Sequence, residues 1–235
     1  MARIVVLTGA GISAESGLGT FRDAGGIWAR YDLADVATPE GFARDPALVH
    51  DFYNARRAQA AAARPNAAHL ALARLEQARP GEVAIVTQNV DALHERAGSR
   101  TVLHMHGRLD RALCAACDRR WDAPPRMAAD DPCPFCGRAA TRPDVVWFGE
   151  VPHGLDDCER WLSEAEVFAA IGTSGQVWPA AGFVEAARAA GARTVELTLE
   201  PSEVGPRFDV VRHGRATETV PAAVEAWLDG RLDPP

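Results

Sequence analysis

The spacing of four cysteines constrains the fold of this chain more than any other feature. Cys114 pairs with Cys117 and Cys133 pairs with Cys136, and residues 118–132 lie between the two pairs. Two Cys-x-x-Cys pairs at this separation can supply four thiolates to one tetrahedral Zn²⁺ ion. Because four thiolates fill every position around such an ion, no place is left for water or a substrate. We therefore predict one structural zinc ion and expect the chemistry elsewhere.

Length and charge predict an intracellular globular protein. The 235 residues are enough for one large domain with a small insertion. A formal net charge of -7 argues against non-specific binding to nucleic acid. No apolar stretch approaches the ~20 residues of a membrane span, and the apolar run at Ile4 follows Met1 too closely for a signal peptide. We expect a cytoplasmic protein, because cysteines spaced for metal suit a reducing compartment. We also expect a monomer.

Short apolar runs alternate with alanine-rich amphipathic stretches along most of the chain. This alternation is typical of a Rossmann-like, doubly wound α/β domain with a parallel sheet. Gly191 and Gly230 follow two of the amphipathic stretches, where a helix C-cap favours glycine. The expected strands are 3–8, 83–87, 101–105, 167–172, 194–199 and 208–212, and the expected helices are 66–78, 179–190 and 218–229.

Two segments interrupt this alternation and predict a smaller module. Residues 21–65 are expected to form a loop followed by helices, and residues 109–143 hold the paired cysteines. Both would be inserted into the Rossmann-like part, within a single domain that spans residues 1–235. The Rossmann-like part would then comprise residues 1–20, 66–108 and 144–235.

The first expected strand leads into a glycine-rich turn. Gly9 and Gly11 would allow the backbone to approach a phosphate, and a helix starting near Ser13 would direct its amides at the negative charge. Gly9-x-Gly11-x-x-Ala14 formally satisfies the dinucleotide fingerprint. A dehydrogenase is one interpretation of this motif. The irregular segment 19–23 that follows does not suit a hydride-transfer enzyme.

Seven short motifs follow one another along the chain: Thr8-Gly9-Ala10-Gly11-Ile12-Ser13, Phe21-Arg22-Asp23, Thr87-Gln88-Asn89-Val90-Asp91, His104-Met105-His106-Gly107, the two cysteine pairs, Phe148-Gly149-Glu150 and Gly172-Thr173-Ser174. Their order resembles that of the sirtuins, the NAD-dependent protein deacylases, over nearly the whole chain. The signature is similar to that of the bacterial subclass that includes lysine desuccinylases and demalonylases. The resemblance implies a Rossmann domain, a small zinc module and a helical module, with NAD and acyl-lysine meeting in the cleft between them.

The resemblance implies an NAD site built from many segments, in which NAD is consumed as a co-substrate. Phe21 and Arg22 would belong to a mobile loop over NAD. Thr198 stands where the family often carries asparagine near the adenosine ribose. The implied cofactor-binding residues are Gly9, Ala10, Gly11, Ser13, Ala14, Glu15, Thr20, Phe21, Arg22, Gln88, Asn89, Val90, Asp91, Gly172, Thr173, Ser174, Thr198, Leu199, Glu200 and Ala216.

His106 is the expected general base, because a neutral imidazole can accept a proton near pH 7. His104 is the competing candidate, and the family's pattern of a base directly before glycine selects His106. In the sirtuin reaction the acyl oxygen attacks the ribose carbon that bears nicotinamide. The histidine then deprotonates a ribose hydroxyl, and water releases lysine and acyl-ADP-ribose. Asn89 would orient a hydroxyl or water, and Asp91 would hold the nicotinamide amide.

Tyr53 and Arg56 lie three positions apart on an expected helix and therefore share one face. A phenol and a guanidinium together can bind a carboxylate. The resemblance places such a pair at the floor of an acyl pocket, with the small Ala37 leaving room for a longer acyl chain. We therefore expect succinyl- or malonyl-lysine as substrate, with acetyl-lysine also accepted. The alternative is a solvated arginine beside a packed tyrosine, since Arg57 follows directly.

The β-prone run 145–150 is suited to pairing with an extended peptide through its backbone. The alternative for this run is a strand of the core. Val146, Phe148 and Gly149 complete the expected substrate-binding residues. Protein substrates that carry acyl-lysine are the expected partners.

Two other function classes remain open from the sequence. A protein mono-ADP-ribosyltransferase would use the same NAD site. A zinc ribbon without enzymatic activity could bind nucleic acid through the arginines that flank the cysteines. We favour the deacylase because the histidine, the cysteine pairs and the glycine-rich turn agree, and we expect no specific nucleic-acid partner. The flanking arginines are Arg108, Arg111, Arg119 and Arg120.

Overall fold

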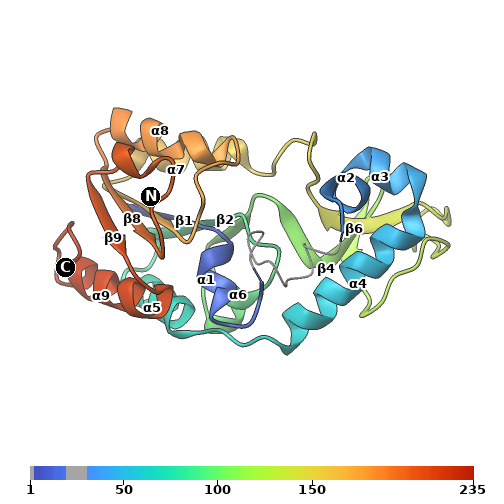
Figure 1. Cartoon of the computed structure of the whole chain (residues 1–235), viewed down its shortest axis with the longest axis horizontal. Helices are drawn as coiled ribbons and strands as arrows, with labels where there is room; N and C mark the ends of the chain where they lie inside the picture. The colour runs from blue at the N-terminus through green and yellow to red at the C-terminus, as the bar shows by residue number, and fades with distance from the viewer. Residues whose placement is uncertain (1–2, 20–30) are drawn as a thin grey trace.

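The computed structural model of the protein describes residues 3–19 and 31–235. Figure 1 shows a large part, in which helices cover a sheet on both faces, and a smaller part made of α2, α3, α4 and the strands β4 and β6. Within the described residues, no helix is long and apolar enough to cross a membrane. The predicted residues Thr20, Phe21 and Arg22 lie outside the described residues.

The large part is built on a six-stranded sheet in the order β3-β2-β1-β7-β8-β9, with every neighbouring pair parallel. Thr8 at the end of β1 lies opposite both Thr87 and Ile171, so the three central strands end together. This order confirms the predicted Rossmann-like, doubly wound sheet. The strands are β1 (Ile4–Thr8), β2 (Val83–Thr87), β3 (Val102–His104), β7 (Val167–Ile171), β8 (Arg193–Thr198) and β9 (Val210–His213).

The two faces of the sheet are covered by different helices because neighbouring side chains of a strand point to opposite faces. Ile4 and Val6 pack in one core cluster with Leu72 of α5 and Val224 of α9. Val5 packs in a second cluster against α7 and α8, which lie on the other side of the sheet in Figure 1. The helices of this part are α1 (Ala10–Ala14), α5 (Ala67–Ala78), α6 (Leu93–Ala97), α7 (Leu155–Glu164), α8 (Phe183–Ala189) and α9 (Ala216–Leu228).

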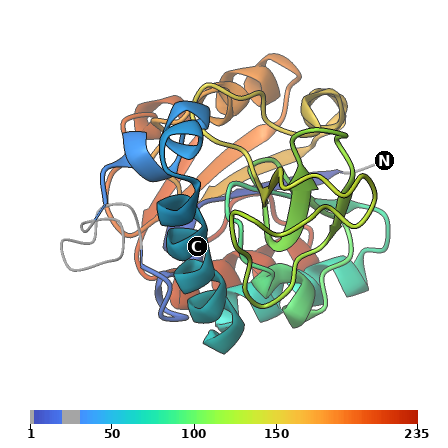
Figure 2. The ribbon, with the colours of Figure 1, turned by 90° about the vertical axis from the view of Figure 1, so that its right-hand side faces the viewer.

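The small part combines three helices with an antiparallel sheet in the order β5-β4-β6. Arg57 of α4 is buried and donates through Nε to the Leu109 carbonyl at 2.7 Å. The Asn54 amide donates to the Met127 carbonyl at 2.8 Å, so one face of α4 is fixed to the small sheet (Figure 2). The elements are α2 (Leu33–Val36), α3 (Pro39–Arg44), α4 (Pro46–Ala62), β4 (Gly107–Cys114), β5 (Arg120–Asp122) and β6 (Thr141–Val145).

Three details differ from the expectations. The first helix begins at Ala10 and not near Ser13. The expected helix 179–190 divides into a 3₁₀ turn, η2 (Ala180–Gly182), and α8. The alternative that the run 145–150 is a core strand is wrong beyond Val145, because β6 ends there and the following residues lie outside any strand. The Glu150 carboxylate accepts the Trp147 N–H at 2.8 Å, and this bond closes the turn in place of strand pairing.

Three glycines allow the ends of β1 and β7 to approach each other. A Cβ atom on Gly9 would lie 2.7 Å from the Gly172 carbonyl oxygen, and one on Gly11 would lie 2.7 Å from the Gly172 Cα. Gly172 itself has a φ of +60°, and its Cβ would lie 2.5 Å from the Ile12 nitrogen. The glycines are therefore required by the contact between two protein loops.

We predict that Gly172→Ala lowers the free energy of unfolding by about 2–4 kcal/mol. The left-handed conformation alone costs an alanine about 1–2 kcal/mol, and the overlap with Ile12 adds to it. Urea unfolding would measure the loss. Gly191→Ala is the matched control, because Gly191 has a φ of +90° with nothing within 4 Å of its Cβ position. Equal losses in the two variants would contradict the role of the loop contact.

Candidate active site

The carboxyl ends of the parallel strands bring most of the predicted cofactor residues together. The Asn89 side-chain amide donates to the Gly9 carbonyl at 3.0 Å, and the Gln88 amide donates to the Thr173 hydroxyl at 3.1 Å. Open α/β sheets bind ligands at this edge. The predicted residues found here are Gly9, Ala10, Gly11, Ser13 and Ala14 after β1, Gln88, Asn89, Val90 and Asp91 after β2, and Gly172, Thr173 and Ser174 after β7.

A buried network of hydrogen bonds holds Asn89 and Asp91. The Ser13 hydroxyl donates to Asp91 Oδ2 at 3.1 Å and accepts from the Asn89 amide at 3.2 Å. The backbone N–H of Leu93 donates to Asp91 Oδ1 at 3.0 Å. Burial raises the pKa of Asp91, while the hydrogen bonds from Leu93 and Ser13 oppose the rise. Both side chains are therefore fixed in place before any ligand arrives.

Two buried histidines behind this network were not found from the sequence. His69 Nε2 lies 3.5 Å from the Ser13 hydroxyl, and its Nδ1 lies 3.0 Å from the Asn66 side-chain oxygen. Burial lowers the pKa of His69 to about 4. His94 Nε2 lies 3.0 Å from the Thr8 hydroxyl, and burial lowers its pKa as well. Both rings are therefore neutral near pH 7 and act as polar supports. The only sequence signal was the Asn-x-x-His capping pattern at the start of α5.

The environment of His104 removes it as a general base. Its Nδ1 lies 3.0 Å from the Asn89 carbonyl oxygen, and its Nε2 lies 2.8 Å from the Glu95 carboxylate. A backbone carbonyl and a carboxylate thus occupy both ring nitrogens, so neither nitrogen is available to a substrate. Burial alone would raise the pKa of Glu95, but the hydrogen bond with His104 and the charge of Arg108 hold it below its usual value.

His106 lies in the turn after β3 and keeps one nitrogen for chemistry. Its Nδ1 lies 3.2 Å from the Gln88 carbonyl oxygen. Because a carbonyl only accepts, Nδ1 carries the proton and Nε2 keeps its lone pair. Burial lowers the pKa of His106, the Gln88 hydrogen bond opposes this, and His153 contributes to the lowering. The ring is thus neutral near pH 7, as a general base requires.

The predicted acyl-pocket residues gather at an apolar cluster between α4 and the small sheet. Tyr53, Ala37 and Val90 belong to this cluster together with residues of β4 and β6. Tyr53 is buried, and Arg56, which is partly exposed, has its guanidinium carbon 5.8 Å from the Tyr53 ring centre. Burial lowers the pKa of Arg56, while Tyr53 and the charge of Asp91 raise it. Because Val90 directly precedes Asp91, the cluster adjoins the network described above.

The residues of the expected peptide-binding run lie next to the base and the pocket. The Val146 N–H donates to the His106 carbonyl at 2.9 Å, and the Phe148 N–H donates to the Ala37 carbonyl at 2.9 Å. Phe148 is about half exposed, at 51%. Gly149 has a φ of +90° and lies within the turn that ends this segment. The structure therefore brings Val146, Phe148 and Gly149 to the same region as Ala37 and His106.

The four paired cysteines form one cluster with the geometry of a zinc site. All four Sγ atoms lie within 4.8 Å of one another, and the Cys114–Cys136 and Cys117–Cys133 distances are 3.7 and 3.8 Å. A tetrahedral Zn²⁺ with Zn–S bonds of about 2.3 Å requires sulfur atoms about 3.8 Å apart. The thiolate set fits a structural zinc ion that ties β4 to the loop before β6.

Residues 9–179 match the sequence model of the Sir2 family. The chain belongs to the Sir2 family. The NAD-dependent protein deacylase of Caulobacter vibrioides is 57% identical over 230 residues, which cover 96% of this chain and 97% of the relative. The NAD-dependent protein deacylase of Salmonella typhimurium is 53% identical over 231 residues, which cover 97% of this chain and 85% of the relative.

Solved Sir2 structures share the whole fold. A Sir2 homologue in complex with NAD has a TM-score of 0.89 at 38% identity, covering 98% of this chain and 90% of that one. A Sir2 structure with a deacetylated peptide and 3'-O-acetyl ADP-ribose has a TM-score of 0.80 at 27% identity, covering 96% and 93%. The resemblance to the sirtuins is therefore confirmed at the level of family and fold.

The residues predicted for the adenosine side of the Sir2 site lie at or just after the end of β8 and beside the start of α9. Glu15 accepts from the backbone N–H and hydroxyl of Thr217 at 3.0 and 2.7 Å, so it caps α9 beside Ala216. Thr198 is buried, and its hydroxyl oxygen has no hydrogen-bond partner among the described residues. Leu199 and Glu200 are exposed. The roles of these residues toward the adenosine ribose stay predictions.

Three of the four arginines that flank the zinc module of this Sir2 chain are paired with carboxylates. Arg111 pairs with Asp122 at 2.5 Å, and Arg120 pairs with Asp144 at 3.1 Å. Arg108 pairs with carboxylates as well. Because these three cations are already matched by anions, they do not favour a nucleic-acid backbone. Arg119 lies over the ring of Phe135, with its guanidinium carbon 5.6 Å from the ring centre.

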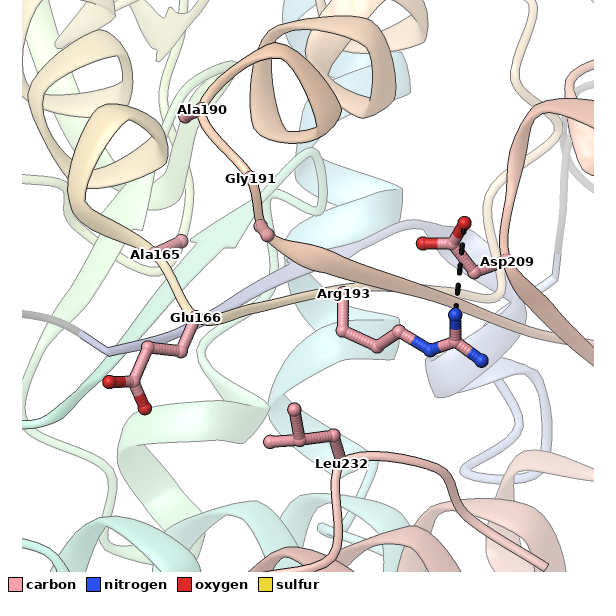
Figure 3. Close-up of a pocket in the computed structure, with 8 residues that line it drawn as sticks. Ala165, Glu166, Ala190, Gly191, Arg193, Asp209 and Leu232 are labelled. Atoms are coloured by element: carbon pink, nitrogen blue, oxygen red, sulfur yellow. Dashed lines mark ion pairs between the residues drawn. The ribbon is translucent and has the colours of Figure 1, made fainter.

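A separate hollow of about 600 Å³ lies at the opposite, amino-terminal edge of β7 and β8. Figure 3 shows Arg193 directed toward Asp209, which lies 3.9 Å away. Arg193 also pairs with Asp233 at 2.6 Å. The charges of the hollow thus compensate one another, and none of the predicted Sir2 site residues lines it. We assign no ligand to it.

We predict that loss of zinc unfolds the small module. Cys114→Ala removes one of four ligands, so bound zinc should fall well below one ion per chain and the melting temperature should drop. Elemental analysis and thermal unfolding would measure the two effects. Cys158→Ala is the control, because Cys158 lies in α7 outside the cluster. An unchanged melting profile in Cys114→Ala would contradict the structural role.

Proposed function

We propose that this protein is an NAD-dependent protein-lysine deacylase that removes succinyl, malonyl and also acetyl groups from lysine and releases nicotinamide and acyl-ADP-ribose. The observation that carries the acyl class is the contact between the buried Tyr53 ring and the partly exposed Arg56, whose guanidinium carbon lies 5.8 Å from the ring centre. The Sir2 relatives named NAD-dependent protein deacylase support the general reaction. The substrates would be proteins that carry acyl-lysine.

The edge of the sheet supplies groups suited to NAD. Asn89 and Asp91 are held rigidly by Ser13, so their polar atoms can bind the nicotinamide amide and a ribose hydroxyl without reorganising. Thr198 offers an unpaired buried hydroxyl on the adenosine side. When bound, NAD would supply the ribose carbon that accepts the acyl oxygen as nicotinamide leaves. A Sir2 homologue that binds NAD supports this assignment.

His106 would move the proton in the second step. Its Nε2 lone pair accepts the proton of a ribose hydroxyl, and that hydroxyl then attacks the carbon derived from the acyl group. The Gln88 carbonyl keeps the proton on Nδ1 and fixes the ring. Water finally releases the free lysine and the acyl-ADP-ribose.

The acyl pocket would select an acidic group by charge and hydrogen bonding. Arg56 provides a cation in a partly desolvated position, where an ion pair is stronger than in bulk water. The neutral phenol of Tyr53 adds a donor at the same point. Ala37 leaves room above the pair because its side chain is a single methyl group. An acetyl group would make none of these polar contacts, so its binding depends on the rest of the cleft.

The protein mono-ADP-ribosyltransferase considered from the sequence is not favoured. Relatives at 52–57% identity, which cover 96–97% of this chain, are named NAD-dependent protein deacylase. An ADP-ribosyltransferase would not need the Tyr53 and Arg56 pair, because no acyl carboxylate takes part in the transfer of ADP-ribose. Mass spectrometry in the assays below would detect any ADP-ribosylated protein.

We predict that deacylation follows the ionisation of His106. Since burial lowers its pKa, kcat/KM should stay constant as pH falls to about 6.5, and it should be lost only below that value. His106→Ala should reduce kcat/KM by about 10²–10⁴-fold. A pH–rate profile with an acylated peptide and NAD would measure both effects. An acidic limb centred above the ordinary histidine pKa would contradict the assignment.

We predict that Arg56→Met removes acidic-acyl activity selectively. Loss of a charged hydrogen-bond pair costs about 1.5–3 kcal/mol, or roughly 10–150-fold in kcat/KM for succinyl- and malonyl-lysine peptides. Acetyl activity should change much less, because an acetyl group has no carboxylate. Matched peptides with NAD, followed by mass spectrometry, would give the three rates.

Arg126→Met is the matched control for this experiment. Arg126 is exposed and pairs with Asp51 on the outer side of the same module. The substitution removes an equal charge and should leave the ratio of succinyl to acetyl activity unchanged. Equal loss of all three activities in Arg56→Met would overturn the pocket assignment.

A further inference from the structure

A buried tryptophan stands directly behind the proposed acyl pocket. Trp147 is only 3% exposed, and its Nε1 lies 3.0 Å from the Tyr53 hydroxyl oxygen. The two ring centres are 6.4 Å apart. An indole N–H can only donate a hydrogen bond, so the Tyr53 oxygen must be the acceptor. The contact therefore has a fixed direction.

This direction determines where the Tyr53 hydrogen points. Burial raises the pKa of Tyr53, so its hydroxyl keeps its proton at neutral pH. A phenol has one hydrogen to donate, and its oxygen also accepts. Trp147 donates to that oxygen at 3.0 Å, and the guanidinium of Arg56, which carries only donors, has its carbon 5.8 Å from the centre of the Tyr53 ring. Because the indole N–H occupies the oxygen and Arg56 cannot accept, the hydroxyl hydrogen is left to another group that accepts.

The indole is itself held from two sides. The guanidinium carbon of Arg142 lies 3.5 Å from the Trp147 ring centre. Arg142 pairs with both carboxylate oxygens of Glu150 at 2.6 and 2.9 Å, and Glu150 accepts the Trp147 backbone N–H at 2.8 Å. A stacked cation and a fixed backbone leave the ring little freedom.

We infer that Trp147 is a positioning residue for acidic-acyl selectivity, whose indole N–H orients the Tyr53 hydroxyl as a donor to the acyl carboxylate. The Arg142–Glu150 pair keeps the indole in place. This inference rests on the proposed function and adds to it the residue that sets the direction of the Tyr53 hydrogen bond. If Trp147 contributed only packing, its substitution would change activity toward all acyl groups equally, since Phe42 and Tyr53 contact its ring whatever the substrate.

The test is Trp147→Phe, which keeps an aromatic ring and removes the N–H donor. We expect KM for succinyl- and malonyl-lysine peptides to rise about 3–10-fold with kcat nearly unchanged. The kinetic constants for the acetyl-lysine peptide should change less than about twofold. Replacement of Trp147 by 3-benzothienylalanine, which preserves the bicyclic shape with sulfur in place of N–H, should give the same result if the phenylalanine variant does not fold.

A double-mutant cycle separates orientation from packing. In a Tyr53→Phe background there is no hydroxyl to orient, so Trp147→Phe should have no further effect on the succinyl KM. An undiminished effect in that background, or equal loss with all three acyl groups, would overturn the role of Trp147. So would a wild-type acyl profile in both Trp147 variants.

The Arg56→Met measurement distinguishes failure of this inference from failure of the proposed function. If Arg56→Met loses acidic-acyl activity while both Trp147 variants keep it, the pocket stands and only the role of Trp147 fails. If the unmodified protein shows no acidic-acyl activity and Arg56→Met has no selective effect, both the pocket and the role of Trp147 fail.

Discussion

The common register of the parallel strands is the constraint on which the rest of the structure depends. Thr8 stands level with Thr87 on one side and Ile171 on the other, so three chain segments leave the sheet at the same height. The loops that follow these strands are therefore in direct contact. Gly172 allows this contact because a Cβ atom there would overlap the segment after β1. The site at this edge is thus a direct product of backbone pairing.

A neutral polar layer separates this edge from the apolar core. His69 and His94 are buried with lowered pKa values, since a charged imidazole would lose its hydration there. His69 lies against the Ser13 hydroxyl and His94 against the Thr8 hydroxyl, so hydrogen bonds link both rings to the ends of the strands. Such a layer orients Asn89 and Asp91 without placing a competing charge beside them. His106, whose Nδ1 is bonded to the Gln88 carbonyl, keeps the lone pair of Nε2 at this edge.

Local patterns in the sequence predicted most of the fold and much of the site. Buried parallel strands are continuous apolar runs, so their positions were correct to within a residue or two. The contact between Trp147 and Tyr53 joins positions 94 residues apart and left no local signal. Glu15 has its partner 202 residues away and therefore caps a helix that no local pattern linked to it. The alternative of a core strand beyond Val145 failed because β-propensity does not reveal that the Glu150 carboxylate accepts the Trp147 N–H there.

Helix α4 carries two sets of contacts within five consecutive positions. Arg56 is partly exposed beside the Tyr53 ring, whereas Asn54 and Arg57 are bonded to the zinc module. Tyr53 is buried and belongs to the apolar core of that module. A change at Arg56 can therefore alter the charge of the proposed acyl pocket while the helix keeps its support, whereas a change at Tyr53 also alters the core. Substrate charge can thus vary at one position of a scaffold that is otherwise inherited unchanged.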